Sequence, residues 1–263
     1  MQAAERFNGK KEVYQAYRPS YPSKMLDDLN LLFIRSSKVN PNDITIADIG
    51  AGTGIFSKLL LDLGFHVIAV EPNVSMAEAL YELQKHYPKQ LTVQIASAEQ
   101  TDLADQSVDH IVCAQAFHWF SAELAKQEFT RIKRPDGYTA LIWNQRAIEV
   151  SDFMRDYEQL FIKYDQIDKL VSYSNVGHKR VSPESLADFY GGAAPQLYTY
   201  GNSQQLDYIG LLGRIQSSSF SLKKEDVLWP QFVDDVKKLF QKHEHNDKVE
   251  MLYRTELYLN AII

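Results

Sequence analysis

The chain has 263 residues, of which 45% are hydrophobic, and it carries 28 Lys and Arg against 34 Asp and Glu, a formal net charge of −6. This length suits one α/β domain with an inserted or capping segment, because a single core of this size buries most of its apolar surface. The acidic balance offers no general attraction to DNA, RNA or anionic lipid, so we expect neither a nucleic-acid nor a membrane partner.

The first residues lack a basic region followed by an apolar one, and no stretch approaches 18 uninterrupted apolar residues, so we predict a cytoplasmic protein. The single cysteine, Cys113, cannot form an intramolecular disulfide. His and Cys residues do not have zinc spacing, and no metal is expected.

Strands and helices alternate in the pattern of the first half of the chain. Short β-branched or apolar runs bounded by polar residues predict strands at residues 44–49, 66–71, 91–96, 108–114 and 137–143. Apolar residues at helical spacing predict helices between them, at residues 55–63, 74–86 and 122–133. Such alternation favours a parallel sheet with helices on both faces and a ligand beyond the carboxyl ends of the strands.

After Arg146 the pattern changes. The sequence predicts an amphipathic helix at residues 152–171, a polar loop at 172–182, a short helix at 183–190 and a strand at 196–206 that returns to the sheet. Two more helices are expected at residues 208–217 and 223–243. Apolar and polar residues then alternate from Val249 to Asn260, which indicates a last strand with one face covered.

A glycine-rich turn follows the first expected strand, in the run Asp48-Ile-Gly-Ala-Gly-Thr-Gly54, and the second expected strand ends on Glu71-Pro72. A carboxylate at that position can accept ribose hydroxyls, so this half of the chain reads as a nucleoside-binding unit. A dinucleotide site would have the spacing G-x-G-x-x-G, whereas here the third glycine comes one residue early. Asp48 also opposes a phosphate and favours an ammonium group, which counts against NAD or FAD. The remaining alternative is a turn in which the glycines serve only the backbone.

Asp48, the spacing of the glycines in the turn, and Glu71, 23 residues after Asp48, together resemble the first motif of class I S-adenosylmethionine-dependent methyltransferases. Residues 7–22, with the run Tyr17-Arg-Pro-Ser-Tyr-Pro22, are similar to the N-terminal arm of small-molecule methyltransferases related to trans-aconitate and ubiquinone-pathway enzymes, the type 11 group. The likeness covers residues 7 to about 146 well and the remainder loosely.

The resemblance implies an α/β, Rossmann-like class I methyltransferase fold, with a seven-stranded mixed sheet, helices on both faces and an antiparallel last strand. It implies an N-terminal lid or helical arm in residues 1–40 and a core that binds S-adenosylmethionine in residues 41–146. Residues 147–225 would form a helical cap and acceptor region with a return strand, and residues 226–263 a last helix and strand that complete the core.

By the same resemblance Glu71 would hold the ribose, and Ala98 and Glu99 would meet the adenine. Arg18 would pair with the methionine carboxylate, and Gln115 would border the sulfonium. The full set expected to bind the donor is Asp48, Gly50, Ala51, Gly52, Gly54, Glu71, Pro72, Ala98, Glu99, Gln115, Ala116, Arg18 and Tyr17.

Residues expected at the acceptor are Tyr14, Tyr21, His118, Trp119 and Arg214. His118 is a candidate general base, or else it shapes the pocket by packing. Arg214 is a candidate partner for the carboxylate of an acidic acceptor, or else it pairs with Asp207 or Asp226 at the surface.

The expected reaction is direct in-line displacement of the methyl group onto an oxygen, nitrogen or carboxylate of a small molecule. One alternative is a protein that binds S-adenosylmethionine or S-adenosylhomocysteine without methyl transfer. Another is a protein or nucleic-acid methyltransferase. The acidic charge opposes it, and the run Ala114-Gln-Ala-Phe117 lacks the Asn-Pro-Pro-Tyr set that grips a planar amino group.

Overall fold

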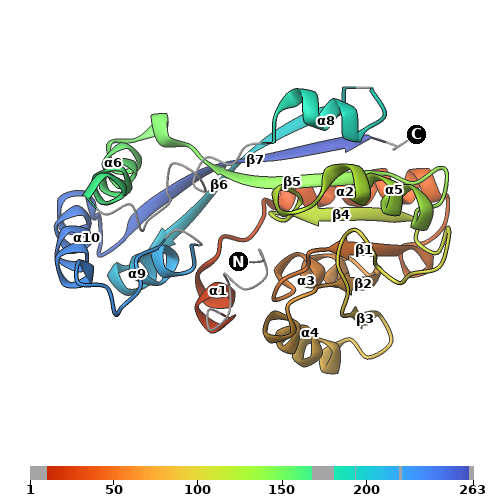
Figure 1. The fold of residues 1–263 in the computed structure, drawn as a ribbon, viewed down its shortest axis with the longest axis horizontal. Coiled ribbons are helices and arrows are strands. Elements are labelled where there is room, and N and C mark those ends of the chain that lie inside the picture. Colours follow the sequence, from red (N-terminus) through yellow and green to blue (C-terminus); the bar gives the residue numbers. More distant parts are fainter. Residues whose placement is uncertain (1–10, 168–180, 193, 219–220, 261–263) are drawn as a thin grey trace.

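The computed structural model describes residues 11–167, 181–192, 194–218 and 221–260. Within these residues the strands form one seven-stranded sheet in the order β3-β2-β1-β4-β5-β7-β6 (Figure 1). The neighbours from β3 to β5 pair in parallel, while β7 runs antiparallel to β5 on one side and to β6 on the other. The predicted fold, a mixed sheet with an antiparallel last strand, is confirmed.

The strands lie close to their predicted positions. They are β1 Thr45–Ile49, β2 His66–Val70, β3 Leu91–Gln94, β4 His110–Ala114, β5 Thr139–Arg146, β6 Gln196–Leu206 and β7 Val249–Asn260. Four of the five residues of β1 and of β4 are buried, as expected for parallel strands covered on both faces. Buried residues alternate with more exposed ones along β7, which matches the predicted strand with one covered face.

The helices are α1 Lys11–Tyr17, α2 Ser23–Ser37, α3 Ile55–Asp62, α4 Val74–His86, α5 Ala122–Ile132, α6 Asp152–Ile167, α8 Pro183–Phe189, α9 Tyr208–Gln216 and α10 Trp229–His243. The helix expected from Lys223 begins only at Trp229, because Pro230 is favoured in the first turn of a helix and disfavoured in its interior. The predicted end of the helix at residues 152–171 and most of the loop at 172–182 lie outside the described residues.

Two apolar clusters pack on the two faces of the parallel strands. One joins α2, α3 and α4 to the sheet through residues such as Phe33 and Leu60, and the other joins α5 and α8 through Phe129 and Phe189. Helices therefore cover both faces, as predicted. We call β1 to β5 with α2 to α5 the Rossmann part.

The helices α6, α9 and α10 lie together at the far end of β6 and β7 (Figure 1). A third apolar cluster, which includes Phe161 and Phe232, packs these elements against one another. We call these three helices, with the adjoining ends of β6 and β7, the cap lobe. Between the two parts lies α1, which contacts α9 of the cap lobe and α4 of the Rossmann part. None of the helices in the described ranges has the length and apolar character needed to cross a membrane.

Candidate functional site

The chain leaves β1 through three glycines with positive φ, Gly50 at 73°, Gly52 at 58° and Gly54 at 83°. A Cβ on Gly50 would lie 2.5 Å from Ala116 Cβ, and one on Gly54 would lie 2.7 Å from Leu80 Cδ2 on α4. Gly50 and Gly54 therefore let neighbouring segments approach closely. A Cβ on Gly52 would meet nothing within 4 Å, so that glycine faces open space.

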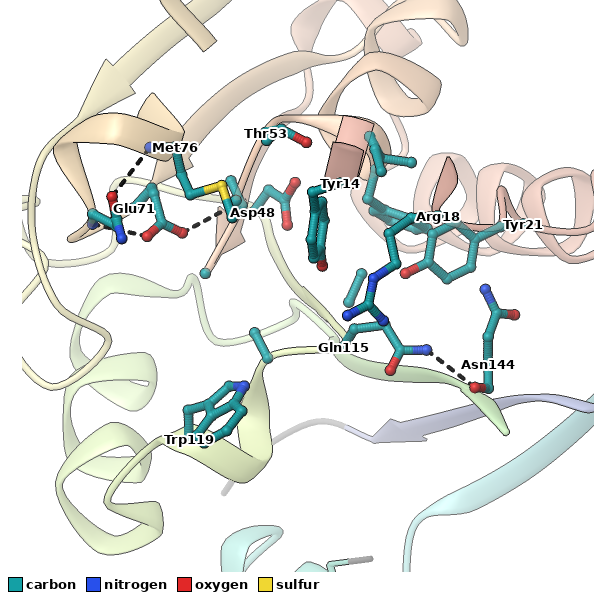
Figure 2. A pocket seen from close by; sticks show the side chains of 18 of the residues that line it. Tyr14, Arg18, Tyr21, Asp48, Thr53, Glu71, Met76, Gln115, Trp119 and Asn144 are labelled. Atoms are coloured by element: carbon teal, nitrogen blue, oxygen red, sulfur yellow. Dashed lines mark hydrogen bonds between the residues drawn. The ribbon is translucent and has the colours of Figure 1, made fainter. Parts of the chain in front are cut away.

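That open space is a cavity at the carboxyl ends of the strands, between the glycine turn, the N-terminal arm and α9 (Figure 2). It holds about 1050 Å³ of empty volume, part of it open to solvent. This is the location at which open α/β sheets bind their ligands. The lining residues are Tyr14, Arg18, Pro19, Tyr21, Asp48, Gly50, Ala51, Gly52, Thr53, Ile55, Phe56, Glu71, Pro72, Asn73, Met76, Ala114, Gln115, Ala116, Trp119, Phe120, Asn144 and Arg214.

Two carboxylates line the cavity beside the glycine turn. Asp48 is 1% exposed, and its Oδ2 accepts a hydrogen bond from Ser57 Oγ at 2.6 Å, while its buried Oδ1 has no hydrogen-bond partner among the described residues. Burial raises the pKa of Asp48 to about 7, and the nearby Glu71 adds to this effect while the Ser57 hydrogen bonds oppose it. Asp48 thus offers one free acceptor to a cationic ligand group.

Glu71 stands just after β2, where its carboxylate is oriented by two backbone N–H groups (Figure 2). Its Oε2 accepts from Gly52 N at 2.8 Å and its Oε1 from Asn73 N at 2.8 Å. Burial raises the pKa of Glu71, and these two N–H groups counteract part of the rise. Each carboxylate oxygen keeps a further lone pair for a ligand hydroxyl.

Gln115, just after β4, has a φ of 59°, which a residue with a side chain rarely adopts. Its backbone N–H donates to Ile142 O at 2.8 Å, and its Nε2 makes a long hydrogen bond of 3.4 Å to Asn144 O (Figure 2). These contacts hold the unusual backbone, and such conformations gather at functional sites.

The N-terminal arm is fixed to the sheet by three side-chain amides. Asn144 Nδ2 and Asn202 Nδ2 donate to Ser20 O at 3.2 and 2.8 Å, and Gln204 Nε2 donates to Tyr17 O at 3.1 Å. In this position Tyr14, Arg18 and Tyr21 all face the cavity (Figure 2).

Arg18 and Arg214 lie at the side of the cavity where the arm meets α9. Arg18 Nη2 donates to Ser217 O at 2.7 Å, and its guanidinium carbon is 4.6 Å from the centre of the Tyr14 ring. In the part of the chain that the structure describes, its buried Nε has no hydrogen-bond partner. Arg214 is 4% exposed, and its Nε donates to Tyr253 Oη at 3.0 Å.

The alternative that Arg214 pairs with Asp207 at the surface is wrong. Arg214 is buried and lines the cavity, whereas Asp207 Oδ1 accepts from Gly210 N at 2.6 Å and so caps α9. Among the ion pairs of the described residues, none joins Arg214 to Asp226.

Five of the residues predicted from the sequence are placed beside the cavity lining rather than in it: Gly54, Ala98, Glu99, Tyr17 and His118. Glu99 Oε1 accepts from Ser121 N at 2.9 Å where α5 begins, and the Tyr17 ring packs on Gly213 of α9. The Nδ1 of His118 accepts from Trp143 Nε1 at 3.3 Å, which fits the packing alternative better than a general base.

The cavity also includes residues that the sequence analysis missed, among them Asn73, Met76 and Asn144. Asn73 Oδ1 caps α4 by accepting from Met76 N at 3.2 Å, which places both residues beside Glu71. Asn144 lies in the last part of β5. The general location of ligands at the carboxyl ends of parallel strands was a signal that could have found it.

Residues 47–141 match a family model described as a methyltransferase domain. An uncharacterized methyltransferase of Schizosaccharomyces pombe is 37% identical over 134 residues, which are 51% of this chain and 50% of that protein. One from Mycobacterium tuberculosis is 35% identical over 134 residues, again 51% of this chain and 50% of the relative. The chain therefore spans about half the length of these curated relatives.

Solved structures are similar over more of the chain. A putative type II methyltransferase from Anaeromyxobacter dehalogenans has a TM-score of 0.60 at 18% identity and covers 94% of this chain and 99% of its own. A putative methyltransferase from an antibiotic biosynthesis pathway of Anabaena variabilis has a TM-score of 0.58 at 20% identity, with 92% and 98% covered. These likenesses show the fold. The family match and the sequence relatives identify residues 47–141 as a methyltransferase domain.

Proposed function

We propose that the chain transfers the methyl group of S-adenosylmethionine to a small-molecule acceptor, and that the cavity beside Gly52 holds the donor. The observation that carries the proposal is a pair of buried polar atoms in the cavity lining that have no hydrogen-bond partner among the described residues. A free carboxylate oxygen of Asp48 and an unpartnered guanidinium nitrogen of Arg18 fit the ammonium and the carboxylate of a zwitterionic amino acid.

The other lining groups fit the rest of the donor. Glu71 follows the second strand, where a carboxylate can accept two ribose hydroxyls. Gly52 leaves room for close approach to the backbone. The tyrosine rings of Tyr14 and Tyr21 can attract a sulfonium by cation–π contact. When bound, the donor supplies a methyl group that is already activated by the positive sulfur.

The protein's contribution is then to position the acceptor in line with the methyl group and to exclude water. Such positioning can lower a barrier by roughly 7–11 kcal/mol at the upper range of effective molarities. A dedicated base is optional in this scheme. We propose accordingly that His118 shapes the wall behind Trp119, that residues 1–40 act as a lid, and that residues 147–225 form the acceptor region.

The acidic net charge favours a small acceptor over a nucleic acid. Calorimetric titration of the chain with S-adenosylhomocysteine, and then with NADH and ATP, tests the proposal. We expect micromolar binding of S-adenosylhomocysteine alone. Binding of NADH or ATP in its place would contradict the assignment of the cavity.

A further inference from the structure

Arg18 and Arg214 are two cations in one cavity wall, and their partners in the described part of the chain are neutral. Arg18 donates to the Ser217 carbonyl. Arg214 donates to the hydroxyls of Tyr253, Ser217 and Ser218 at 3.0, 3.3 and 3.0 Å. Among the ion pairs of the described residues, none includes either arginine.

A buried charge without a counter-charge is costly. In the cap lobe, a buried arginine with a structural role is paired with a carboxylate. Arg146, at the end of β5, lies 3.2 Å from Glu158 Oε2, and both side chains are largely buried. Arg214 is as deeply buried, and among the described residues its partners include no carboxylate. The difference indicates that a ligand supplies the counter-charge.

The charges of the cavity allow the ligand to be identified by class. When Asp48 and Glu71 are both ionised, their charges balance those of Arg18 and Arg214. The donor carries an ammonium, a carboxylate and a sulfonium, so the cavity gains one positive charge when the donor enters. An acceptor with one negative charge restores neutrality, and a carboxylate matches the planar guanidinium fork of an arginine.

The two arginines come from different parts of the chain. Arg18 belongs to the arm, close to Tyr14 (Figure 2). Arg214 belongs to α9 in the cap lobe, and both arginines lie outside residues 47–141 that match the methyltransferase domain model. The arm precedes the Rossmann part and α9 follows it, so the two cations reach the cavity from separate elements.

We propose that the acceptor is a small carboxylic acid and that Arg214 binds its carboxylate, while Arg18 serves the donor. This inference rests on the proposed function. It assigns Arg214 to acceptor recognition, which predicts that the two arginines affect different ligands.

The test is a calorimetric titration of the protein saturated with S-adenosylhomocysteine. The probes are three matched pairs: benzoate and benzamide, octanoate and octanamide, and glutarate and glutaramide. We expect at least one acid to bind at least tenfold more tightly than its amide. The Arg214→Gln variant should lose this preference while its affinity for S-adenosylhomocysteine stays within about threefold, and Arg214→Lys should retain part of the preference.

The Arg18→Gln variant should show the reverse pattern, with at least a tenfold loss of affinity for S-adenosylhomocysteine. Arg155→Gln, at an exposed arginine of α6, is the matched control and should change neither affinity. If no acid of the panel binds better than its amide, or if the preference survives Arg214→Gln, the inference is overturned and the proposed function stands. If S-adenosylhomocysteine itself does not bind, both are overturned.

Discussion

Gly52 differs from the other two glycines of the first turn because the position of its missing side chain is open. Gly52→Leu should place a side chain in the donor's space and lower the affinity for S-adenosylhomocysteine by more than about 100-fold. The free energy of unfolding should fall by only about 1–2 kcal/mol, the cost of a left-handed backbone for a residue with a side chain. Calorimetric titration and thermal unfolding measure the two effects.

Gly192 provides a matched control for this substitution. Its φ is 88°, a Cβ there would meet nothing within 4 Å, and it is not part of the cavity lining. Gly192→Leu should therefore show the same loss of stability with unchanged affinity. Equal affinities for the two variants would show that the donor does not lie against Gly52.

Asp48 should make the protein less stable as the pH rises. Its pKa is about 7 in the folded chain, because of burial and the neighbouring Glu71, against about 4 in an unfolded chain. The folded chain therefore holds an extra proton at Asp48 between these pH values, and the contribution of Asp48 to the free energy of unfolding falls across this range by up to about 4 kcal/mol. Asp48→Asn should remove this slope in denaturant titrations at pH 4 to 8. Asp188→Asn, at an exposed carboxylate of α8, should leave it in place.

The sequence could predict Asp48, Gly52 and Glu71 as cavity residues because Asp48 and Gly52 lie in one short glycine-rich run and Glu71 ends the next predicted strand. Gln115 was expected at the cavity, but its left-handed backbone was not, since that conformation depends on hydrogen bonds to β5. Asn144 belongs to no motif, and only the general location of ligands at the carboxyl ends of parallel strands pointed to it.

At the scale of elements, His110 joins α2 to β4 and β5. Its Nδ1 accepts from Tyr138 N at 3.0 Å, so Nε2 carries the proton and faces Ser37 Oγ at 2.9 Å. The ring stacks on Phe33 with centroids 4.0 Å apart. Burial lowers the pKa of His110 to about 4, although Asp109 opposes the shift and Lys133 adds to it.

The unfolded chain therefore binds a proton at His110 between about pH 6.5 and 4 that the folded chain does not. The free energy of unfolding should fall as the pH falls through this range, by up to about 3 kcal/mol. This pH dependence is opposite in sign to that of Asp48, so we expect to see it in the Asp48→Asn variant, where the contribution of Asp48 is absent. Adding His110→Gln to the Asp48→Asn variant should flatten the pH dependence of the free energy of unfolding. Adding the same change at the exposed His245 should not. An unchanged slope in the His110 variant would contradict the assignment.

The N-terminal arm is an element whose position depends on hydrogen bonds to β6. Gln204→Ala removes the bond to Tyr17 O, and we expect the affinity for S-adenosylhomocysteine to fall about 2–10-fold, from about 0.5–1.5 kcal/mol for one hydrogen bond. Gln196→Ala, at the other end of the same strand, is the control. If both variants bind equally well, the arm does not contribute to donor binding.

Most elements could be predicted because each shows its own period in the sequence. The strand at Gln196–Leu206 and the helix at Val74–His86 have the bounds that the sequence predicted. Pro230 is a local signal for the start of α10, because proline is favoured in the first turn of a helix. The prediction of a helix from Lys223 overlooked this signal. The antiparallel direction of the last strand came from the family resemblance, whereas its pairing between β5 and β6 has no local signal and was not predicted.

At the scale of the whole molecule, β7 belongs both to the Rossmann part and to the cap lobe. Val249, Met251 and Tyr253 are part of the core of the cap lobe, while Leu257 and Leu259 are part of the core on the Rossmann part. β7 pairs with eight residues of β5 and with all 11 residues of β6. Loss of the core of the cap lobe or of the Rossmann part therefore disturbs the strand on which the other core depends. We expect the Rossmann part and the cap lobe to unfold together.

Phe232→Ala tests this coupling from the cap lobe. The ring is 1% exposed and lies edge-on to Tyr164 at 5.0 Å, so its removal should cost about 3–5 kcal/mol. Phe129→Ala is the matched change in the Rossmann part, where the ring is equally buried. Differential scanning calorimetry should show a single transition for both variants, at a lower temperature than the wild type and with calorimetric and van't Hoff enthalpies in agreement. Two transitions in the Phe232→Ala variant, with the upper one at the wild-type temperature, would show instead that the cap lobe unfolds by itself. The cavity would then lie between two independent units, because Arg214 belongs to one and Asp48 to the other.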